Sequence, residues 1–242
     1  MSTTGTNVGG ESTRLNLINL TIDGHDVTVP LGTTVFDAAR THGIAIPTLC
    51  HQQNETPVGV CRVCVVEIAG GKALGAACIR PAEAKMVVTT NSDTVLQARK
   101  TLYELLLADH PLPCTREQNS GDCELEGQAR AAGVTSSRFP KRQNPRGVDD
   151  SSLSIAVDHD ACIMCDRCVR GCSEIRHNDV IARMGKGYEA RIAFDQNLPM
   201  GASSCVSCGE CMVSCPTGAL TNKKIVGQRL ETGDVLKVQE LL

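Results

Sequence analysis

The residues with the clearest chemistry are eight cysteines in two dense runs near the C-terminal end of the sequence. ACIMCDRCVRGC begins at Ala161 and SCVSCGECMVSCP begins at Ser204, and both place cysteines as Cys-x2-Cys-x2-Cys-x3-Cys. Chains that bind two 4Fe–4S cubes have this spacing, in which three cysteines of a run bind one cube and the fourth binds the other. We therefore expect one cube on Cys162, Cys165, Cys168 and Cys215, and a second on Cys172, Cys205, Cys208 and Cys211.

Two other uses of cysteine compete with this interpretation. Zinc sites also use Cys-x2-Cys steps, but they need separate pairs, not four cysteines in one dense run, twice over. Disulfides are common in small exported proteins, whereas this chain has 242 residues and its polar tail, residues 1–14, lacks the apolar core of an export signal. Iron–sulfur clusters are the favoured use.

A second group of cysteines lies in the N-terminal third. Cys50, Cys61, Cys64 and Cys78 are separated by 10, 2 and 13 residues. Plant-type ferredoxins bind a 2Fe–2S cluster through Cys-x4-Cys-x2-Cys and a distant fourth cysteine, so only the first gap here is longer. We expect these four thiolates to bind one 2Fe–2S cluster. His51 adjoins a ligand but is interpreted as a polar loop residue, because a Rieske centre needs two histidines.

The elements that position this N-terminal group follow from the hydrophobic pattern. Residues 15–22 and 26–30 alternate around a turn and predict a β-hairpin, and residues 34–41 predict a short helix. Residues 63–68 predict the strand that leaves the cysteine loop. Hairpin, helix, cluster loop and returning strand together predict a β-grasp ferredoxin domain over residues 15–92.

The rest of the chain predicts a mixed architecture. Residues 93–109 have helical apolar spacing and end at His110, before two prolines that stop a helix. Residues 180–184 and 188–194 predict a strand pair between the two cysteine runs, in an insert interpreted as structural. The predicted fold class is α+β. The expected segments are a disordered tail (1–14), a β-grasp 2Fe–2S domain (15–92), a small helical domain with a His/Cys site (93–138), a linker (139–153), a two-cluster 4Fe–4S ferredoxin domain (154–223) and a C-terminal tail (224–242).

The composition excludes several classes of function. A net charge of −3 gives no electrostatic footprint for nucleic acid or for a membrane surface, and aromatic residues make up only 2% of the chain. The apolar runs are too short to span a bilayer, so a cytoplasmic location is expected. The sequence has no Gly-x-Gly-x-x-Gly fingerprint, so the chain is not expected to bind a nicotinamide nucleotide itself. Residues 226–242 predict either a short helix or strand pair that docks a partner, or a solvated tail.

Several segments together resemble a known family. These are GVCRVCVVEI, ELLLADHPLPC, SGDCELEG, SRFP at 137–140, and both ferredoxin runs. They resemble the iron–sulfur electron-transfer (small diaphorase) subunit of NAD-linked hydrogenases, which is similar to the N-terminal region of the large iron–sulfur subunit of complex I, of NAD-dependent formate dehydrogenases and of iron-only hydrogenases. The likeness covers about residues 15–222.

The resemblance implies a third, His-ligated cube with the spacing His-x3-Cys-x2-Cys-x5-Cys. His110, Cys114 and Cys123 match this pattern, but Glu117 stands at the middle cysteine position. A carboxylate suits iron–sulfur chemistry less well than a thiolate. Three states stay open: Glu117 or water completes a cube, a three-iron 3Fe–4S cluster forms, or the site is empty. The retained spacing favours a bound cluster.

The resemblance also implies the function. The chain is expected to be a non-catalytic relay subunit that passes single electrons between a flavoprotein NADH-oxidising subunit and a hydrogenase or formate dehydrogenase catalytic subunit. Two alternatives are a free-standing multi-cluster carrier and a protein in which the clusters are structural staples. Arg62, Arg167 and Arg170 adjoin ligands and either stabilise reduced clusters or are surface charges.

Overall fold

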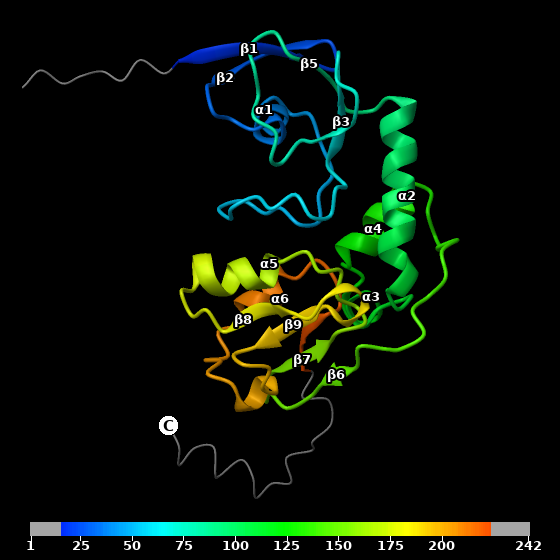
Figure 1. Ribbon diagram of the computed structural model, residues 1–242, viewed down its shortest axis with the longest axis vertical. Helices are drawn as coiled ribbons and strands as arrows, with labels where there is room; N and C mark the ends of the chain where they lie inside the picture. The colour runs from blue at the N-terminus through cyan, green and yellow to red at the C-terminus, as the bar shows by residue number, and fades with distance from the viewer. Residues whose placement is uncertain (1–15, 224–242) are drawn as a thin grey trace, which may run out of the picture. The chain divides into compact units, whose positions relative to one another are not determined.

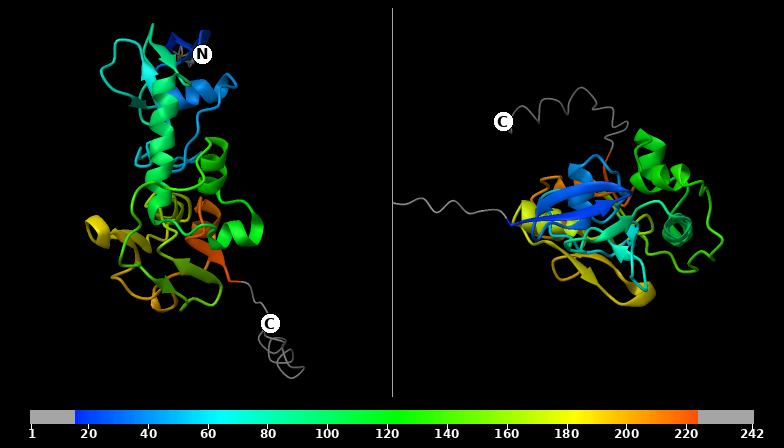
Figure 2. Two further views of the ribbon diagram at one scale, coloured as in Figure 1. Left: turned by 90° about the vertical axis from the view of Figure 1, so that its right-hand side faces the viewer. Right: turned by 90° about the horizontal axis from the view of Figure 1, so that it is seen from above.

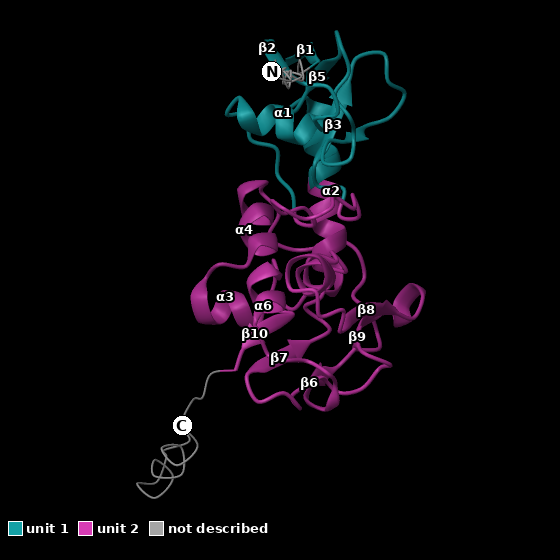
Figure 3. Cartoon of the chain, turned by 90° about the vertical axis from the view of Figure 1, so that its left-hand side faces the viewer, with its two compact units in different colours: residues 1–48, 62–99 teal, residues 49–61, 100–242 magenta. Residues whose placement is uncertain are grey.

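The computed structural model describes residues 16–223 (Figure 1). Within that range the chain forms two compact units, coloured separately in Figure 3. One unit contains residues up to 48 and residues 62–99, and the other contains residues 49–61 and those from 100 onward. The loop 49–61, predicted as part of the 15–92 domain, thus groups with the second unit. The predictions for 1–14 and 224–242 lie outside the described residues.

The first unit is built on a five-stranded mixed sheet with the order β2-β1-β5-β3-β4. Strand β1 is antiparallel to β2 and parallel to β5, while β3 is antiparallel to both β5 and β4. The expected β-grasp fold is confirmed. Its elements are β1 (Leu17–Ile22), β2 (His25–Pro30), α1 (Val35–Thr41), β3 (Val65–Ile68), β4 (Gly75–Ala76) and β5 (Val87–Thr89).

The predicted hairpin forms because its turn residues and the alternation of buried and exposed residues in its two strands favour the same pairing. Asp23 and Gly24 have φ of 49° and 80°, the positive values of a turn whose twist matches the flanking strands. Alternate residues of the hairpin then face one core, where they pack against the apolar face of α1. Helix α1 is capped by Thr34, whose hydroxyl accepts a hydrogen bond from the Asp37 N–H at 3.1 Å.

Helix α2 has the predicted bounds, Asp93–Asp109. It is vertical in Figure 1 and is seen end-on in the right-hand view of Figure 2. Its first turns belong to the first unit, where the buried Arg99 donates to the carbonyl oxygens of Val63 and Val65 at 3.1 and 2.9 Å. This satisfied guanidinium fixes the helix to the start of β3.

The second unit continues from α2 into short helices and two small sheets. One sheet has the order β10-β7-β6, and the other is the β8–β9 hairpin. The elements are α3 (Thr115–Ser120), α4 (Glu124–Ala131), β6 (Val148–Asp149), β7 (Ile155–Asp158), α5 (Arg167–Arg170), the π-helical turn η1 (Gly171–Ile175), β8 (Ile181–Met184), the 3-10 turn η2 (Gly187–Glu189), β9 (Arg191–Phe194), the 3-10 turn η3 (Met200–Ala202), α6 (Glu210–Ser214) and β10 (Leu220–Asn222).

The insert between the cysteine runs differs in detail from its prediction. The second strand was predicted from Tyr188, but it begins at Arg191 because residues 187–189 form the turn η2. Gly185 takes a φ of 77°, and a Cβ there would collide with the carbonyl of Glu189. The wide turn therefore depends on a residue that has no side chain.

Candidate metal centres

Four cysteines of the first predicted set line one cavity in the second unit. Cys162, Cys165 and Cys168 come from the first run, and Cys215 comes from the second. Apolar side chains such as Ile192 and Leu220 line the same cavity, which shields the thiols from water. The placement of Cys215 among first-run cysteines supports the exchange of the fourth ligand that the spacing predicts.

The two cysteine runs follow the same local backbone path. Met164 and Ser207 each precede the second cysteine of a run, and their φ values are 55° and 53°. Their N–H groups donate to the first sulfur of the same run, both at 3.4 Å. The next left-handed residues, Asp166 and Gly209, are the N-cap residues of α5 and α6. Such turns direct N–H groups into a concavity that favours a negatively charged group.

Helices α5 and α6 pack closely because glycine lies between them. A Cβ built at Gly171 would lie 2.7 Å from the Ser214 Oγ and 3.2 Å from the Glu210 Cγ. The backbone of Gly171 can approach α6 this closely only because glycine has no side chain. The close helix pair holds the two cysteine loops beside each other.

Burial strongly raises the pKa of three thiols of the first set and of one thiol of the second. Burial raises the pKa of Cys162 to about 11 and lifts the pKa of Cys165 well above its usual value. Burial, followed by the negative charges of Cys205 and Cys208, raises the pKa of Cys211 to about 12. Without metal these thiols stay protonated at neutral pH, and iron must displace the protons when it binds. The first set, which lines one apolar cavity, fits the cube predicted for it, and the joint binding of a cube by Cys172, Cys205, Cys208 and Cys211 stays a prediction.

Arg170 joins the loop of Cys50 to the first cysteine run. It is 4% exposed, and its Nη2 donates to the carbonyl oxygens of both Cys50 and Cys165. Its Nη1 donates to the Thr56 carbonyl at 2.7 Å and lies 3.3 Å from the buried carboxylate of Glu55. Burial raises the pKa of Glu55, and the charge of Arg170 opposes that shift.

The interpretation of Arg167 and Arg170 as surface charges is wrong. Both side chains are buried, and Arg167 donates to the Glu124 carboxylate at 2.8 and 3.0 Å. Arg62, by contrast, is exposed. A buried arginine that is tied to a carboxylate or to carbonyl groups has a structural task, which the sequence could not distinguish from surface charge.

The four cysteines of the predicted 2Fe–2S set are all buried. In the first unit, the Cys64 and Cys78 sulfurs lie 3.3 Å apart. In the second unit, the Cys61 N–H donates to the Cys50 sulfur at 3.5 Å. The Arg62 φ of 62° provides a left-handed turn inside the Cys-x2-Cys step, as in the other runs. Their joint ligation of one cluster, and the polar-loop role of His51, stay predictions.

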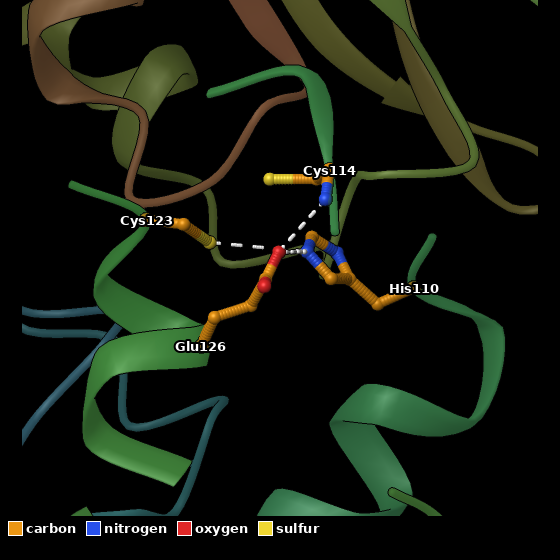
Figure 4. Close-up of side chains that lie close together, drawn as sticks. All are labelled: His110, Cys114, Cys123 and Glu126. Carbon is orange, nitrogen blue, oxygen red and sulfur yellow. Dashed lines mark hydrogen bonds and ion pairs between the residues drawn. The ribbon is translucent and has the colours of Figure 1, made fainter. Parts of the chain in front are cut away.

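A third group lies where α2, α3 and α4 meet (Figure 4). The donor atoms of His110, Cys114, Cys123 and Glu126 lie within 4.8 Å of one another, and all four residues are buried. His110 follows α2, Cys114 caps α3, Cys123 caps α4, and Glu126 lies in the first turn of α4. Each donor therefore sits at or beside a helix end.

The geometry of this group is convergent. The His110 Nε2 lies 3.4 Å from a Glu126 carboxylate oxygen and 3.8 Å from the Cys123 sulfur. The same Glu126 oxygen accepts a hydrogen bond from the Cys114 N–H at 2.8 Å. On the other side of the imidazole, His110 Nδ1 lies 3.2 Å from the carbonyl oxygen of Ala161. When Nδ1 carries the proton and donates to this carbonyl, Nε2 carries none and faces the other three donors.

The structure places Glu117 differently from its predicted role as a ligand. Its carboxylate accepts a hydrogen bond from the Cys123 N–H at 3.1 Å and lies 2.8 Å from an Arg130 nitrogen. Glu126, which was not predicted, occupies the place beside the donors. Its spacing was a usable signal, because a side chain three residues after Cys123 lies on the same face of a helix that begins there.

The two thiols of the group differ sharply in acidity. A hydrogen bond from Cys123 lowers the pKa of Cys114 to about 3, a shift that burial opposes and that a hydrogen bond from His110 supports. That hydrogen bond and burial raise the pKa of Cys123. Burial also raises the pKa of Glu126, against the effect of the Cys114 N–H.

The comparisons with known proteins agree with these three regions. A 2Fe-2S iron-sulfur cluster binding domain matches residues 16–93, the NADH-ubiquinone oxidoreductase-G iron-sulfur binding region matches 99–138, and a 4Fe-4S dicluster domain matches 158–222. A chain in the crystal structure of an NAD+-reducing [NiFe]-hydrogenase in the H2-reduced state is 31% identical, with a TM-score of 0.78. The match covers 86% of this chain and 88% of that one.

The chain belongs to the iron–sulfur electron-transfer subunits of the NAD-reducing hydrogenase type. Two curated relatives are subunit HndD of an NADP-reducing hydrogenase from Solidesulfovibrio fructosivorans, 38% identical over 90% of this chain, and an NADH-quinone oxidoreductase subunit from Rhizobium meliloti, 37% identical over 84%. The chain spans 38% and 24% of the length of these relatives. In residues 16–223, no helix combines the length and apolarity needed to cross a membrane.

Membership of this iron–sulfur subunit family gives the centres their chemistry. The chain carries the 2Fe–2S domain, the His/Cys region and the 4Fe–4S dicluster domain. Such clusters accept and donate single electrons, and their potentials depend on hydrogen bonds to sulfur, on burial and on charge. In this chain the backbone donors of the cysteine loops and the apolar cavity walls would supply those influences to bound clusters.

The His/Cys region does not fit the family's cube, which is bound by one histidine and three cysteines. The third thiolate is missing where Glu117 stands, and that carboxylate is held by the Cys123 N–H and by Arg130. Glu126 fills the space between the remaining donors (Figure 4). The expectation of a retained cluster here stays a prediction, and the donor set points to different chemistry.

Proposed function

We propose that the chain relays single electrons between a flavoprotein subunit that oxidises NADH and a catalytic subunit such as a hydrogenase or a formate dehydrogenase. A flavin takes the hydride of NADH as an electron pair, whereas each cluster carries one electron at a time. In this proposal the 2Fe–2S end faces the flavoprotein, and the two cubes lead to the catalytic subunit. The location proposed for the complex is the cytoplasm.

The bridging contact of Arg170 carries this proposal. Cys50 is a predicted 2Fe–2S ligand and Cys165 is a predicted cube ligand, and a single guanidinium nitrogen donates to both of their carbonyl oxygens. The backbones of two predicted ligands are therefore separated by one side-chain group. Electron transfer becomes steeply slower with distance, so this short separation favours a relay from the first centre to the next.

The arrangement of the two cubes supports continuation of the same path. The charge of Cys211, from the second run, is among those that raise the pKa of Cys168 in the first run, although burial is the largest cause. The sulfurs of the two sets are therefore electrostatic neighbours. Adjacent cubes of this kind provide consecutive stations for one electron.

The names of the relatives support the proposed partners. They include hydrogenase and quinone-reductase subunits and an NADPH-Fe(3+) oxidoreductase subunit of Geobacter sulfurreducens, 35% identical over 86% of this chain. Because these names include both NAD- and NADP-linked proteins, we propose the partner's nucleotide as NAD(P) and rank the hydrogenase first on the structural relative.

Anaerobic reduction of the full chain tests the relay. The chain is mixed with an NADH-oxidising flavoprotein subunit and NADH, frozen at successive times and measured by electron paramagnetic resonance. The relay predicts that the 2Fe–2S signal appears first and the cube signals follow. In Arg170→Leu the cube signals are delayed while the 2Fe–2S signal is not, and Arg176→Leu, at an exposed ion pair, serves as the matched control. Clusters that NADH never reduces would contradict the relay.

The alternative function is a free-standing carrier with several clusters. Size-exclusion chromatography of the tagged chain from its native cells separates the two. Stoichiometric elution with larger flavoprotein and catalytic subunits supports the relay, whereas elution of the coloured chain alone supports the carrier. A chain whose clusters take up no electrons in a redox titration would indicate structural staples.

A further inference from the structure

We propose that His110, Cys114, Cys123 and Glu126 bind a single divalent ion of the zinc class in place of a third iron–sulfur cube. The site is distinct from the relay centres of the proposed function. The first argument is convergence. The four donor atoms lie within 4.8 Å of one another. Donors about 2.0–2.3 Å from one tetrahedral ion lie about 3.3–3.8 Å apart, and two of the observed separations are 3.4 and 3.8 Å.

A cube requires the opposite arrangement. Each of its four ligands binds a different iron atom, so the ligands surround the inorganic core and stay apart. Here a Glu126 oxygen lies between the donors, 2.8 Å from the Cys114 nitrogen and 3.4 Å from the His110 Nε2 (Figure 4). A Cβ built at Gly218 would lie 3.0 Å from the Cys114 sulfur, so backbone packs directly against that side of the site.

The donor set suits zinc. Two thiolates, one imidazole and one carboxylate are all established zinc ligands, and four of them complete a tetrahedral structural site. The Ala161 carbonyl, 3.2 Å from the His110 Nδ1, provides the outer hydrogen bond that orients a metal-binding imidazole. The Cys114 N–H and Arg130, 4.0 Å from the other Glu126 oxygen, orient the carboxylate in the same way.

Charge is the third argument. When the ion is bound, two thiolates and a carboxylate bring three negative charges into a buried site, which is costly without positive compensation. A divalent ion supplies two positive charges at the point where the donors meet. The exposed guanidinium of Arg130 contacts both Glu126 and Glu117 and offsets part of the remaining negative charge.

The test is an anaerobic metal count on the full chain. The 2Fe–2S cluster and two cubes contain about 10 iron atoms and about 10 sulfides. The proposal predicts that amount plus about one zinc, or one iron without an accompanying sulfide. Absorption fine structure at the zinc edge should show sulfur near 2.3 Å and nitrogen or oxygen near about 2.0–2.2 Å. About 14 irons and 14 sulfides would overturn the proposal, as would the absence of the additional ion.

Two matched variants identify the ligand. Glu126→Gln keeps an oxygen to accept from the Cys114 N–H but loses the anionic donor, so it should lose the additional ion and keep all the sulfide. Glu117→Gln should keep both. The reverse result would make Glu117 the ligand and overturn the proposal. If Glu126→Gln does not fold, Cys123→Ser is the second variant, because serine still caps α4. In these variants the sulfide content and the cluster spectra should stay unchanged. A loss of sulfide or of cluster signals would concern the relay centres, and this outcome is distinct from a failure of the single-ion proposal.

Discussion

The two-cluster part and the His110 group lie in the same unit and use the same ligand types, yet they are built in opposite ways. In the first, both cysteine runs have left-handed turns, at Met164 and Ser207, and the first-run cysteines with Cys215 are spread around an apolar cavity. In the second, three helix ends direct their donors toward one point, with Glu126 between them. The direction of the donors and the missing third thiolate together distinguish this site for one ion from a cluster site.

Contacts between the two regions show that the second is not an isolated loop. The Ala161 carbonyl, which faces His110, also accepts from the Thr217 hydroxyl at 2.8 Å, and Ala161 immediately precedes Cys162. The Pro216 carbonyl, directly after Cys215, accepts from the Glu124 N–H at 2.9 Å and so caps α4. The His110 group is thus supported by backbone on both sides of the first cube's predicted ligands.

The largest expected effect is that of Cys215→Ala. Because Cys215 lines the cavity of the first run, its loss should remove that cube, about 4 irons, and leave the second cube in place. Cys172→Ala should do the reverse. Iron and sulfide analysis with paramagnetic resonance of the remaining cube checks both variants. Loss of the second run's cube in Cys215→Ala would show that the two runs do not exchange ligands.

Glu117→Cys tests whether the His110 group can be converted into a cluster site. A thiolate at this position would complete the His-x3-Cys-x2-Cys-x5-Cys spacing, and the chain should then gain about 4 irons and about 4 sulfides in place of the single ion. Glu117→Ser is the matched control because it removes the same ion pair with Arg130 without adding a thiolate. An unchanged iron content in Glu117→Cys would show that donor direction alone excludes a cube.

Most of the ligand chemistry could be predicted from sequence because it depends on local spacing. The ligand sets of the two cysteine runs follow from neighbouring residues and stay predictions, whereas the hairpin and α2 follow from neighbouring residues and have the expected structure. Glu126 could not be chosen over Glu117, because the decision rests on Arg130 and on the Cys123 N–H, whose positions depend on how α3 and α4 pack. The burial of Arg170 likewise depends on a loop more than a hundred residues earlier in the chain.

Arg170→Leu should destabilise the second unit strongly. It leaves the Glu55 carboxylate, 2% exposed, without its ionic partner, and breaking a buried pair in this way costs about 3–5 kcal/mol. The midpoint of thermal cluster bleaching should fall by roughly 6–20 °C. The double variant Arg170→Leu with Glu55→Leu should recover part of that loss, since no charge is then left buried.

The control for that variant is Arg176→Leu. Arg176 also pairs with a glutamate, Glu210, but its side chain is 51% exposed. Exposed pairs contribute about 0–1 kcal/mol, so the bleaching midpoint should change little. Equal effects of the two arginine substitutions would mean that burial does not distinguish them and that Arg170 is not a structural bridge.

The smallest expected effect concerns packing against the His110 group. Gly218→Ala would place a Cβ 3.0 Å from the Cys114 sulfur and from the Arg116 nitrogen, and overpacking of this kind costs about 1–3 kcal/mol. Because a bound ion would hold Cys114 in place, the cost should be larger in the metal-loaded chain than in the Glu126→Gln background. Gly127→Ala in α4 is the control: apart from its chain neighbours and the backbone of its own helix, no atom lies within 4 Å of its Cβ, and alanine should stabilise the helix by about 0.5–1 kcal/mol. Equal costs of Gly218→Ala in both backgrounds, measured by the thermal midpoint, would show that no ion fixes the Cys114 sulfur.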